Sequence, residues 1–339
     1  MNTVRTRPTV LVLLDSPTRT VDEVRPAVLE LITLGRTLGR VDVVTLGAPS
    51  VEVLATLGAY GVELVHQAQL PTSVPESSFH LTSVLAAVLT TAVRRNDADV
   101  LLVPSSFAGK EAAAVTAAHL GSGLVVDASA LEWTTTDGGG EAPLRIGKRV
   151  FAGTWDTVST VASDPAVVTI RANAVVAEPA ESAGHATVEP LPVEVHAPAV
   201  TVVERRLKER TVGRPTLEEA AVVVAGGRGT NGDFGPVNEL AEALGAAVGA
   251  TRDAVFEGWF DRYIGQTGVT VAPRLYIGAG ISGAPHHRGG MQASQVVVSV
   301  NNDPEAPIFE ISDFAVVGDL ADVLSQAAAV IREHKAATD

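Results

Sequence analysis

The chain has 339 residues, of which 46% are hydrophobic and 19% charged, so it holds enough apolar material for two buried cores. Its formal net charge of −14 disfavours nucleic acid or an anionic membrane surface as a partner, because phosphates would be repelled. Cysteine is absent, which excludes disulfides, thiolate metal sites and a cysteine nucleophile.

The segment before Val10 lacks the basic-then-apolar order of a secretory signal. No uninterrupted apolar stretch is long enough to span a bilayer. We therefore expect a cytoplasmic protein that is not membrane-embedded.

Short apolar runs alternate with segments of helical period over the first 130 residues. Strands are expected at 10–14, 41–46, 62–65, 100–103 and 124–126, and helices at 21–38, 51–60, 83–95 and 109–120. Strands that alternate with helices predict an α/β layer with a mainly parallel sheet.

The pattern changes from Leu131 onward. Glycines at 138–140 predict a turn, and short strands are expected at 149–151, 157–161 and 167–171, as antiparallel additions to the first domain. The stretch 177–198 is rich in Pro, Ala and Glu and should be extended, and the basic stretch 205–210 fits a solvated edge strand or a partner contact. Residues 211–216 are the candidate linker, which predicts an N-terminal α/β domain at 1–212 and a second domain at 213–339.

The α/β alternation returns in the second domain. Strands are expected at 221–224, 275–277 and 296–300, and helices at 236–244 and 318–331. This order predicts a second, mainly parallel sheet.

Two loops of the second domain carry the spacing G-x-G-x-x-G, at 227–232 and 278–283. Glycine lets a backbone turn tightly and approach a phosphate, while a following helix offers unpaired N–H groups to the anion. Arg228 adds a positive charge and Ser282 a hydroxyl donor. Either loop alone fits an ordinary strand-to-helix turn, but two at the ends of neighbouring strands favour a bound dinucleotide.

The residue that follows the second strand bears on which dinucleotide is bound. A nicotinamide site expects an acidic residue about 20 positions after its glycines. In this chain the second-strand position, which follows 244–248, ends in Gly249, Ala250, Thr251 and Arg252. An arginine there suits a phosphorylated ribose or another anion and weighs against plain NAD.

The run from Gly265 to Asp319 resembles the alpha subunit of electron-transfer flavoproteins. The matching text is GQTG at 265–268, AP at 272–273, LYI at 275–277, GISGA at 280–284, His287, Asn301 and DPEAPIF at 303–309. AGGRG at 225–229 and GATR at 249–252 are similar to two further family segments. The resemblance covers the layout of the whole chain and the details of its last third.

This resemblance implies that the second domain is a Rossmann-like FAD-binding domain. Carried over to matching positions, it implies the following roles: Arg228 near the cofactor, Thr251 and Ser282 at the pyrophosphate, Arg252 against the flavin ring, Gln266 and Thr267 at the ribityl chain and flavin N5, His287 as a donor to flavin O2, and Asn301 and Asp319 on the adenosine side, with Gly268, Gly280 and Gly283 in the same site. The chemistry is consistent, since a cation such as Arg252 stabilises the negative charge that a flavin gains on reduction.

Simpler interpretations stand beside these roles. Asp319 fits a helix cap, Arg252 a solvated strand-end charge and Asn301 a turn former. His286 and His287 fit surface residues or a metal pair, but adjacent histidines in a strand would point to opposite faces. The chain departs from the family pattern at Val269, where lysine is usual, and at Pro285 and His286, where isoleucine and glutamine are usual.

The leading hypothesis is an electron carrier without substrate conversion of its own. The resemblance implies pairing with an electron-transfer flavoprotein beta subunit. It also implies single-electron transfer in fatty acid beta-oxidation, from flavin dehydrogenases such as acyl-CoA dehydrogenases to the electron-transfer flavoprotein quinone oxidoreductase. One alternative is an NAD(P)-dependent dehydrogenase that uses one of the glycine loops, in which Arg252 would favour a phosphorylated ribose, and another is a regulatory adenosine-binding module in the first domain.

Overall fold

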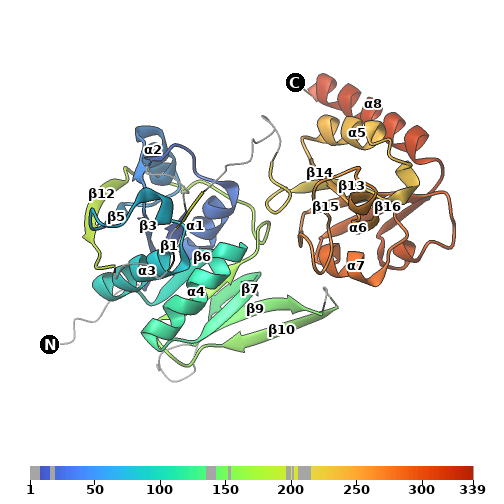
Figure 1. Cartoon of the computed structure of the whole chain (residues 1–339). Coiled ribbons are helices and arrows are strands. Elements are labelled where there is room, and N and C mark those ends of the chain that lie inside the picture. Colours follow the sequence, from blue (N-terminus) through green and yellow to red (C-terminus); the bar gives the residue numbers. More distant parts are fainter. Residues whose placement is uncertain are drawn as a thin grey trace. The chain divides into compact units, whose positions relative to one another are not determined.

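The computed structural model describes residues 8–15, 20–134, 143–151, 154–195, 200, 202–204 and 215–338 (Figure 1). The chain divides into two compact units, one made of Met1–Lys148 and Asp156–Leu207, the other of Arg149–Trp155 and Lys208–Asp339. The expected turn at 138–140, the basic stretch 205–210 and the boundary between 212 and 213 lie outside the described residues.

The N-terminal unit is built on a parallel sheet that, within the described ranges, has seven strands in the order β12-β5-β3-β1-β6-β11-β7. Its strands are β1 (Thr9–Leu14), β3 (Arg40–Thr45), β5 (Leu64–Gln69), β6 (Val100–Pro104), β7 (Leu124–Ala128), β11 (Ala166–Ile170) and β12 (Thr187–Pro192). All six pairs of neighbouring strands in this order are parallel. All six residues of β1 are buried, as a central strand covered on both faces requires.

Helices cover both faces of this sheet. The helices are α1 (Pro26–Leu38), α2 (Val51–Ala59), α3 (Thr82–Asn96) and α4 (Phe107–Leu120), with a short 3-10 turn η1 (Glu76–Ser78). Val10 and Val12 of β1 share a core with α1 and α2. Leu11 and Leu13 face the opposite way and share a second core with α3 and α4. The α/β class with a mainly parallel sheet, predicted from the alternating pattern, is therefore confirmed.

One prediction for this unit is wrong. The strand expected at 167–171 is not an antiparallel addition: as β11 it lies inside the main sheet, parallel to both β6 and β7. All five of its residues are buried, which suits a central position. The antiparallel part is the small sheet of β8 (Ala130–Trp133), β9 (Leu144–Val150) and β10 (Trp155–Thr160), after which the chain returns to the main sheet.

Smaller differences have local causes. Helix α1 starts at Pro26 rather than at 21, because proline suits the first helical turn and residues 20–21 instead form the short strand β2 (Thr20–Val21) beside β4 (Ala48–Pro49). The stretch expected to be merely extended contains β12, an edge strand parallel to β5. Its two prolines are tolerated at an edge, where backbone donors face solvent.

The C-terminal unit is a five-stranded parallel sheet, counted over the described chain, in the order β14-β13-β15-β16-β17. The strands are β13 (Val222–Gly226), β14 (Ala247–Ala250), β15 (Leu275–Ala279), β16 (Val296–Asn301) and β17 (Phe314–Val317). In the unit's own chain order this is 2-1-3-4-5, which reverses direction between β13 and β15. Ligands of such sheets bind outside the carboxyl ends of the strands at that reversal.

The two faces of this sheet are covered differently. Helices α5 (Gly235–Leu244) and α8 (Leu320–Thr338) pack side by side on one face, where Val237, Leu240 and Leu324 join the core (Figure 1). The other face is covered by the segment around Ile264 and Val271, by α7 (Pro285–Met291), and by the 3-10 turn η3 (Pro307–Ile311). That face carries the loops that surround the site.

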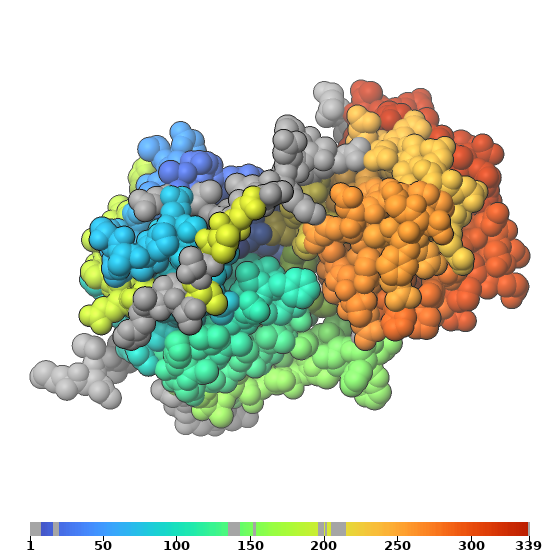
Figure 2. Space-filling model, viewed as in Figure 1, coloured from blue at the N-terminus to red at the C-terminus, as the bar shows by residue number. Residues whose placement is uncertain are grey.

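Three elements of this unit had no clear sequence signal: the five-residue α6 (Arg252–Phe256), the seven-residue α7, and the edge strand β17. The orange stretch that includes α6 lies at the surface on the side seen in Figure 2, and Phe256 is 76% exposed. Among the helices of the described chain, none is both long and apolar enough to cross a membrane.

Candidate functional site

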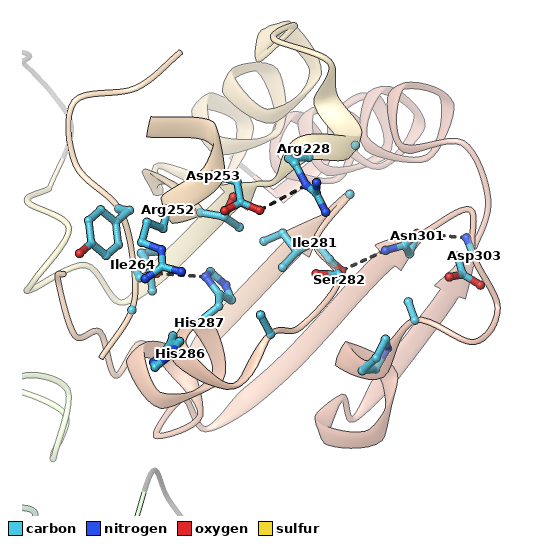
Figure 3. A pocket seen from close by; sticks show the side chains of 18 of the residues that line it. Arg228, Arg252, Asp253, Ile264, Ile281, Ser282, His286, His287, Asn301 and Asp303 are labelled. Carbon is cyan, nitrogen blue, oxygen red and sulfur yellow. Dashed lines mark hydrogen bonds and ion pairs between the residues drawn. The ribbon is translucent and has the colours of Figure 1, made fainter. Parts of the chain in front are cut away.

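A pocket of about 370 Å³ opens at the carboxyl ends of β13 and β15, where the strand order reverses (Figure 3). Eight residues singled out from the sequence line it, and they come from five separate segments: Arg228, Thr251, Arg252, Thr267, Gly280, Ser282, His287 and Asn301. The fold thus brings together side chains that are up to 73 positions apart in the sequence (from 228 to 301).

The two glycine loops interlock at the back of this pocket. The amide of Gly227 donates to Ala279 O at 3.0 Å, and that of Gly229 donates to Gly280 O at 3.0 Å. A Cβ on Gly229 would lie 2.6 Å from the Cα of Gly280, and one on Gly227 would lie 2.4 Å from Gly280 O. These glycines are therefore required by the contact between the loops themselves.

The second loop presents its amides to a ligand. In the described chain, the N–H groups of Ile281, Ser282, Gly283 and Ala284 donate to no residue, and three of these residues line the pocket. The carbonyls of Gly280, Ile281, Ser282 and Gly283 all accept hydrogen bonds, from Gly229 N, Asn301 Nδ2, Ile308 N and Arg288 Nε respectively. Successive unpaired amides of this kind form an anion-binding nest, which suits a diphosphate.

The first loop differs, although its motif is the same. The amides of Thr230 and Asn231 donate within the loop, and that of Gly232 donates to Thr230 Oγ1. Its contribution to the pocket is the side chain of Arg228 together with Gly229. The two loops share one spacing but differ in role: the first supports the second structurally, and the second offers its amides to an anion.

Two arginines give the pocket its positive charge. The Arg228 Nε lies 3.2 Å from Asp253 Oδ2, so part of that charge is neutralised (Figure 3). The Arg252 guanidinium lies 5.8 Å from the centre of the Phe256 ring, one helical turn along α6. Thr251 caps α6 by accepting from Ala254 N at 3.5 Å, and its hydroxyl hydrogen remains available to the pocket.

His287 is buried and has both ring nitrogens engaged. Its Nδ1 lies 3.1 Å from Ile264 O (Figure 3), which can only accept, so Nδ1 carries the hydrogen. Its Nε2 lies 2.8 Å from Tyr276 Oη and then accepts. Burial lowers the pKa of His287 to about 4, opposed by the Ile264 carbonyl, so the ring is neutral near pH 7. Burial likewise raises the pKa of Tyr276.

The expectation that the two histidines lie in a strand is wrong: both are in the first turn of α7. They nevertheless differ in environment, since His287 is buried whereas His286 is exposed and its Nδ1 lies 3.2 Å from Gln266 Oε1. The described residues contain no cluster of three or more potential metal ligands.

Four predicted site residues do not line the pocket, and each has a visible structural task. Gln266 faces α7 through its contact with His286, and a Cβ on Gly268 would lie 2.3 Å from Tyr263 O. Gly283 has φ +87° and would meet Ile308 N at 2.5 Å. Asp319 caps α8, with Oδ1 accepting from Ala321 N at 2.8 Å.

Asn301 lines the pocket but its amide is turned to the chain. Its Nδ2 donates to Ile281 O at 2.9 Å and its Oδ1 accepts from Asp303 N at 3.0 Å. It is therefore both a turn former and a support of the second glycine loop. Sequence reasoning missed Asp253, Tyr263 and Asp303 as lining residues. Asp303 belongs to the matched segment 303–309 but was given no role, and the only signal for Asp253 and Tyr263 was proximity to matched segments.

A parallel sheet that reverses at two glycine loops, with a nest of unpaired amides and two arginines, defines a dinucleotide-binding protein of the Rossmann-like class. Residues 216–292 match the family model described as "Electron transfer flavoprotein FAD-binding domain", and residues 16–196 match "Electron transfer flavoprotein domain". The chain belongs to the electron transfer flavoprotein alpha subunit family, and its C-terminal unit carries that family's FAD-binding domain.

Curated relatives agree over most of the chain. An electron transfer flavoprotein subunit alpha from Mycobacterium leprae is 42% identical, covering 90% of this chain and 93% of that protein. One from Bacillus subtilis is 34% identical, covering 89% and 91%. Protein FixB from Azotobacter vinelandii is 35% identical over 70% of this chain and 66% of that protein. The predicted family, fold class and cofactor are thereby confirmed.

The observed pocket fits FAD. The nest at 281–284 suits its diphosphate, and Arg252 and Arg228 supply positive charge. Glycine is required where the loops meet, since a Cβ on Gly227 or Gly229 would collide with Gly280.

The Arg228–Asp253 pair leads to a testable expectation. Replacing Asp253 by Asn removes a negative charge from an anion pocket and releases Arg228, so FAD should bind roughly two- to threefold more tightly, as suits an exposed pair. Equilibrium titration at low and high salt measures this, and the gain should shrink as salt rises. Glu257→Gln is the control, since Glu257 ends α6 without lining the pocket. Weaker binding in Asp253→Asn would contradict the expectation.

Proposed function

We propose that this chain is the alpha subunit of a heterodimeric electron carrier that holds FAD in its C-terminal unit and converts no substrate of its own. The observation that carries this proposal is the row of four unpaired amides at 281–284, beside a pocket lined by Arg228 and Arg252. When bound, FAD accepts and releases electrons singly. The chain's part is to hold the dinucleotide and to set the charge around its ring.

The individual roles carried over from the family are part of the proposal. Thr251 and Ser282 offer hydroxyl donors to the diphosphate, and Arg252 lies against the flavin ring. Thr267, whose Oγ1 lies 3.0 Å from Tyr263 Oη, is assigned to flavin N5. Gln266 and Asp319 are proposed to contact FAD in addition to the hydrogen bonds that they make within the chain. Asn301 is proposed to act mainly by holding the carbonyl of Ile281 in place. His287 would donate to flavin O2 only in the tautomer that carries the hydrogen on Nε2, which would give up the hydrogen bonds of the free protein to Ile264 O and Tyr276 Oη.

The partners follow from the family. The relatives are named alpha subunits, and we propose a beta subunit of the same flavoprotein as the second chain. We further propose flavin dehydrogenases, such as those that oxidise acyl-CoA, as electron donors and a membrane-bound quinone oxidoreductase as acceptor, with both carrier subunits in the cytoplasm. The absence of a spanning helix among the described residues is compatible with a shuttling carrier.

Co-expression with the beta subunit tests the proposal directly. The purified heterodimer should be yellow, with flavin absorption in the visible range and FAD released on denaturation. Dialysed protein should regain that spectrum with FAD and should ignore NADPH in a fluorescence titration, since the site lacks a distinct set of acid–base groups beside a substrate pocket. A colourless and stable heterodimer that takes up no FAD would refute the proposed function.

Arg252 gives the sharpest residue-level expectation. Its guanidinium lines the pocket and makes a cation–π contact with Phe256 but no ion pair within the described chain, so most of its charge is available to a ligand. Arg252→Ala should weaken FAD binding about tenfold and lower the reduction potential of bound flavin, because reduction adds negative charge that the arginine stabilises. Redox titration with spectral detection measures the potential. Arg274→Ala, on the same unit but outside the pocket lining, should leave both quantities unchanged.

A further inference from the structure

Arg288 lies on α7, is absent from the pocket lining, and makes three polar contacts with segments beside the pocket. Its Nε donates to Gly283 O at 2.7 Å, its Nη2 donates to Pro307 O, and its Nη1 lies 2.9 Å from Glu310 Oε2. The side chain is 20% exposed. It therefore joins the second glycine loop to the turn η3.

The planarity of the peptide unit links the bond between Arg288 and Gly283 O to the direction of the next amide. A trans peptide is planar, so its C=O and the N–H of the next residue point in opposite directions. Fixing the Gly283 carbonyl therefore fixes the direction of the Ala284 N–H. The other three amides of the nest are oriented in the same way, by Gly229 N on Gly280 O, by Asn301 Nδ2 on Ile281 O, and by Ile308 N on Ser282 O.

We propose that Arg288 is a positioning residue for FAD, which orients the Ala284 amide toward the diphosphate by holding the carbonyls of Gly283 and Pro307. The inference rests on FAD being the ligand of this pocket. An anchor is needed at this place, because Gly283 has φ +87° and its peptide could otherwise rotate at little steric cost. Arginine suits the task, since its planar fork reaches two carbonyls at once, whereas lysine offers a single ammonium group.

The carbonyl contacts, rather than the ion pair, carry the proposed role. Glu310 is 71% exposed, and an exposed ion pair contributes little. Glu310→Gln should therefore leave FAD affinity within about twofold of the wild type. Loss of charge-assisted bonds to two carbonyls has a larger effect, expected as roughly a tenfold loss of affinity.

The test uses the full heterodimer and two probes, FAD and ADP. Arg288→Leu should weaken binding of both by about the same factor, roughly tenfold, because both carry the diphosphate. The absorption spectrum of the FAD that remains bound should match the wild type, since neither Arg288 nor Ala284 is among the residues assigned to the flavin ring. Arg288→Lys should recover part of the loss. Arg332→Leu, which removes a surface arginine that pairs with Glu239, is the matched control and should change neither affinity.

The outcomes separate the inference from the proposed function. Unchanged FAD and ADP affinity in Arg288→Leu would overturn the positioning role, and so would loss of FAD affinity with ADP binding intact. Thermal unfolding of the apo-heterodimer shows whether Arg288→Leu is folded; if it is not, Arg288→Lys supplies the comparison, and wild-type affinity for both probes in that variant overturns the proposal. A wild-type protein that binds ADP but no FAD would refute the electron-carrier function and leave the Arg288 test standing.

Discussion

Gly229→Ala should abolish measurable FAD binding, with a loss of affinity of at least about a hundredfold. The added Cβ would lie 2.6 Å from the Cα of Gly280 and 3.0 Å from its carbonyl oxygen. Both are backbone atoms, which cannot swing aside as a side chain does. The two loops must separate, and Gly280 O then loses the amide of Gly229 that orients the Ile281 N–H. Displacement of the loop also moves the neighbouring Ser282 N–H, and two misplaced charge-assisted bonds, from Ile281 and Ser282, account for a loss of this size.

Stability should fall with the same substitution, by about 1–3 kcal/mol, since strain is added where the backbones touch. Gly245→Ala is the matched control. Gly245 has φ +70° at the end of α5 and nothing within 4 Å of its missing Cβ, so alanine there strains the backbone without disturbing a loop. It should cost about 1 kcal/mol of unfolding free energy and leave FAD affinity unchanged. Wild-type FAD affinity in Gly229→Ala, by equilibrium titration, would show that the loops do not depend on this contact.

The sequence predicted the parallel layers well because a buried parallel strand is a continuous apolar run. The runs in β1, β6 and β13 stand out against their polar flanks. The strand β11 was equally visible, but its partners were not. Its neighbours β6 and β7 both precede it in the chain, and a three-stranded antiparallel excursion separates it from β7. Sequence adjacency therefore suggested the wrong sheet.

The candidate site was likewise predicted only in part from the sequence. Sequence motifs identified eight of the lining residues, since glycine spacing and basic residues at strand ends can be recognised in the amino-acid sequence. Motifs did not distinguish the two glycine loops. That difference depends on which carbonyls are already bonded, and the donors come from Asn301, Ile308 and Arg288, which are 20, 26 and 5 positions away from the residues they hold. Long-range hydrogen bonds leave no local pattern.

The short helix α7 explains the misplaced histidines. Pro285 starts the helix, and the two glycines Gly289 and Gly290 weaken any helical signal. Gly290 is nevertheless required, since a Cβ there would lie 2.3 Å from Gly265 N. Tertiary packing thus overrides local propensity. The departure at Val269 also has a structural counterpart, because this valine is 6% exposed and belongs to the core beside Ile264 and Tyr276.

The buried His287 predicts how stability depends on pH. Its folded-state pKa is lowered to about 4 by burial, whereas an unfolded imidazole titrates near its ordinary value of about 6.5. Above the unfolded pKa both states are neutral and the contribution of this group is constant. As pH falls from 6.5 to 4 the unfolded state gains a proton that the folded state does not, so the free energy of unfolding decreases. The decrease reaches about 3 kcal/mol and levels off below pH 4.

The comparison that isolates this effect is His287→Asn against the wild type, with urea unfolding measured at several pH values between 4.5 and 7.5. Near pH 7 the variant should be less stable by about 1–3 kcal/mol, because Tyr276 and Ile264 lose a buried partner. The difference should narrow steadily toward pH 4.5, since the variant cannot gain the proton in the unfolded state. His185→Asn is the control, because that histidine is exposed. If the wild-type and His287→Asn curves stayed parallel across this range, His287 would have to take up its proton at the same pH in the folded and the unfolded protein, and the neutral Tyr276–His287–Ile264 arrangement would be wrong.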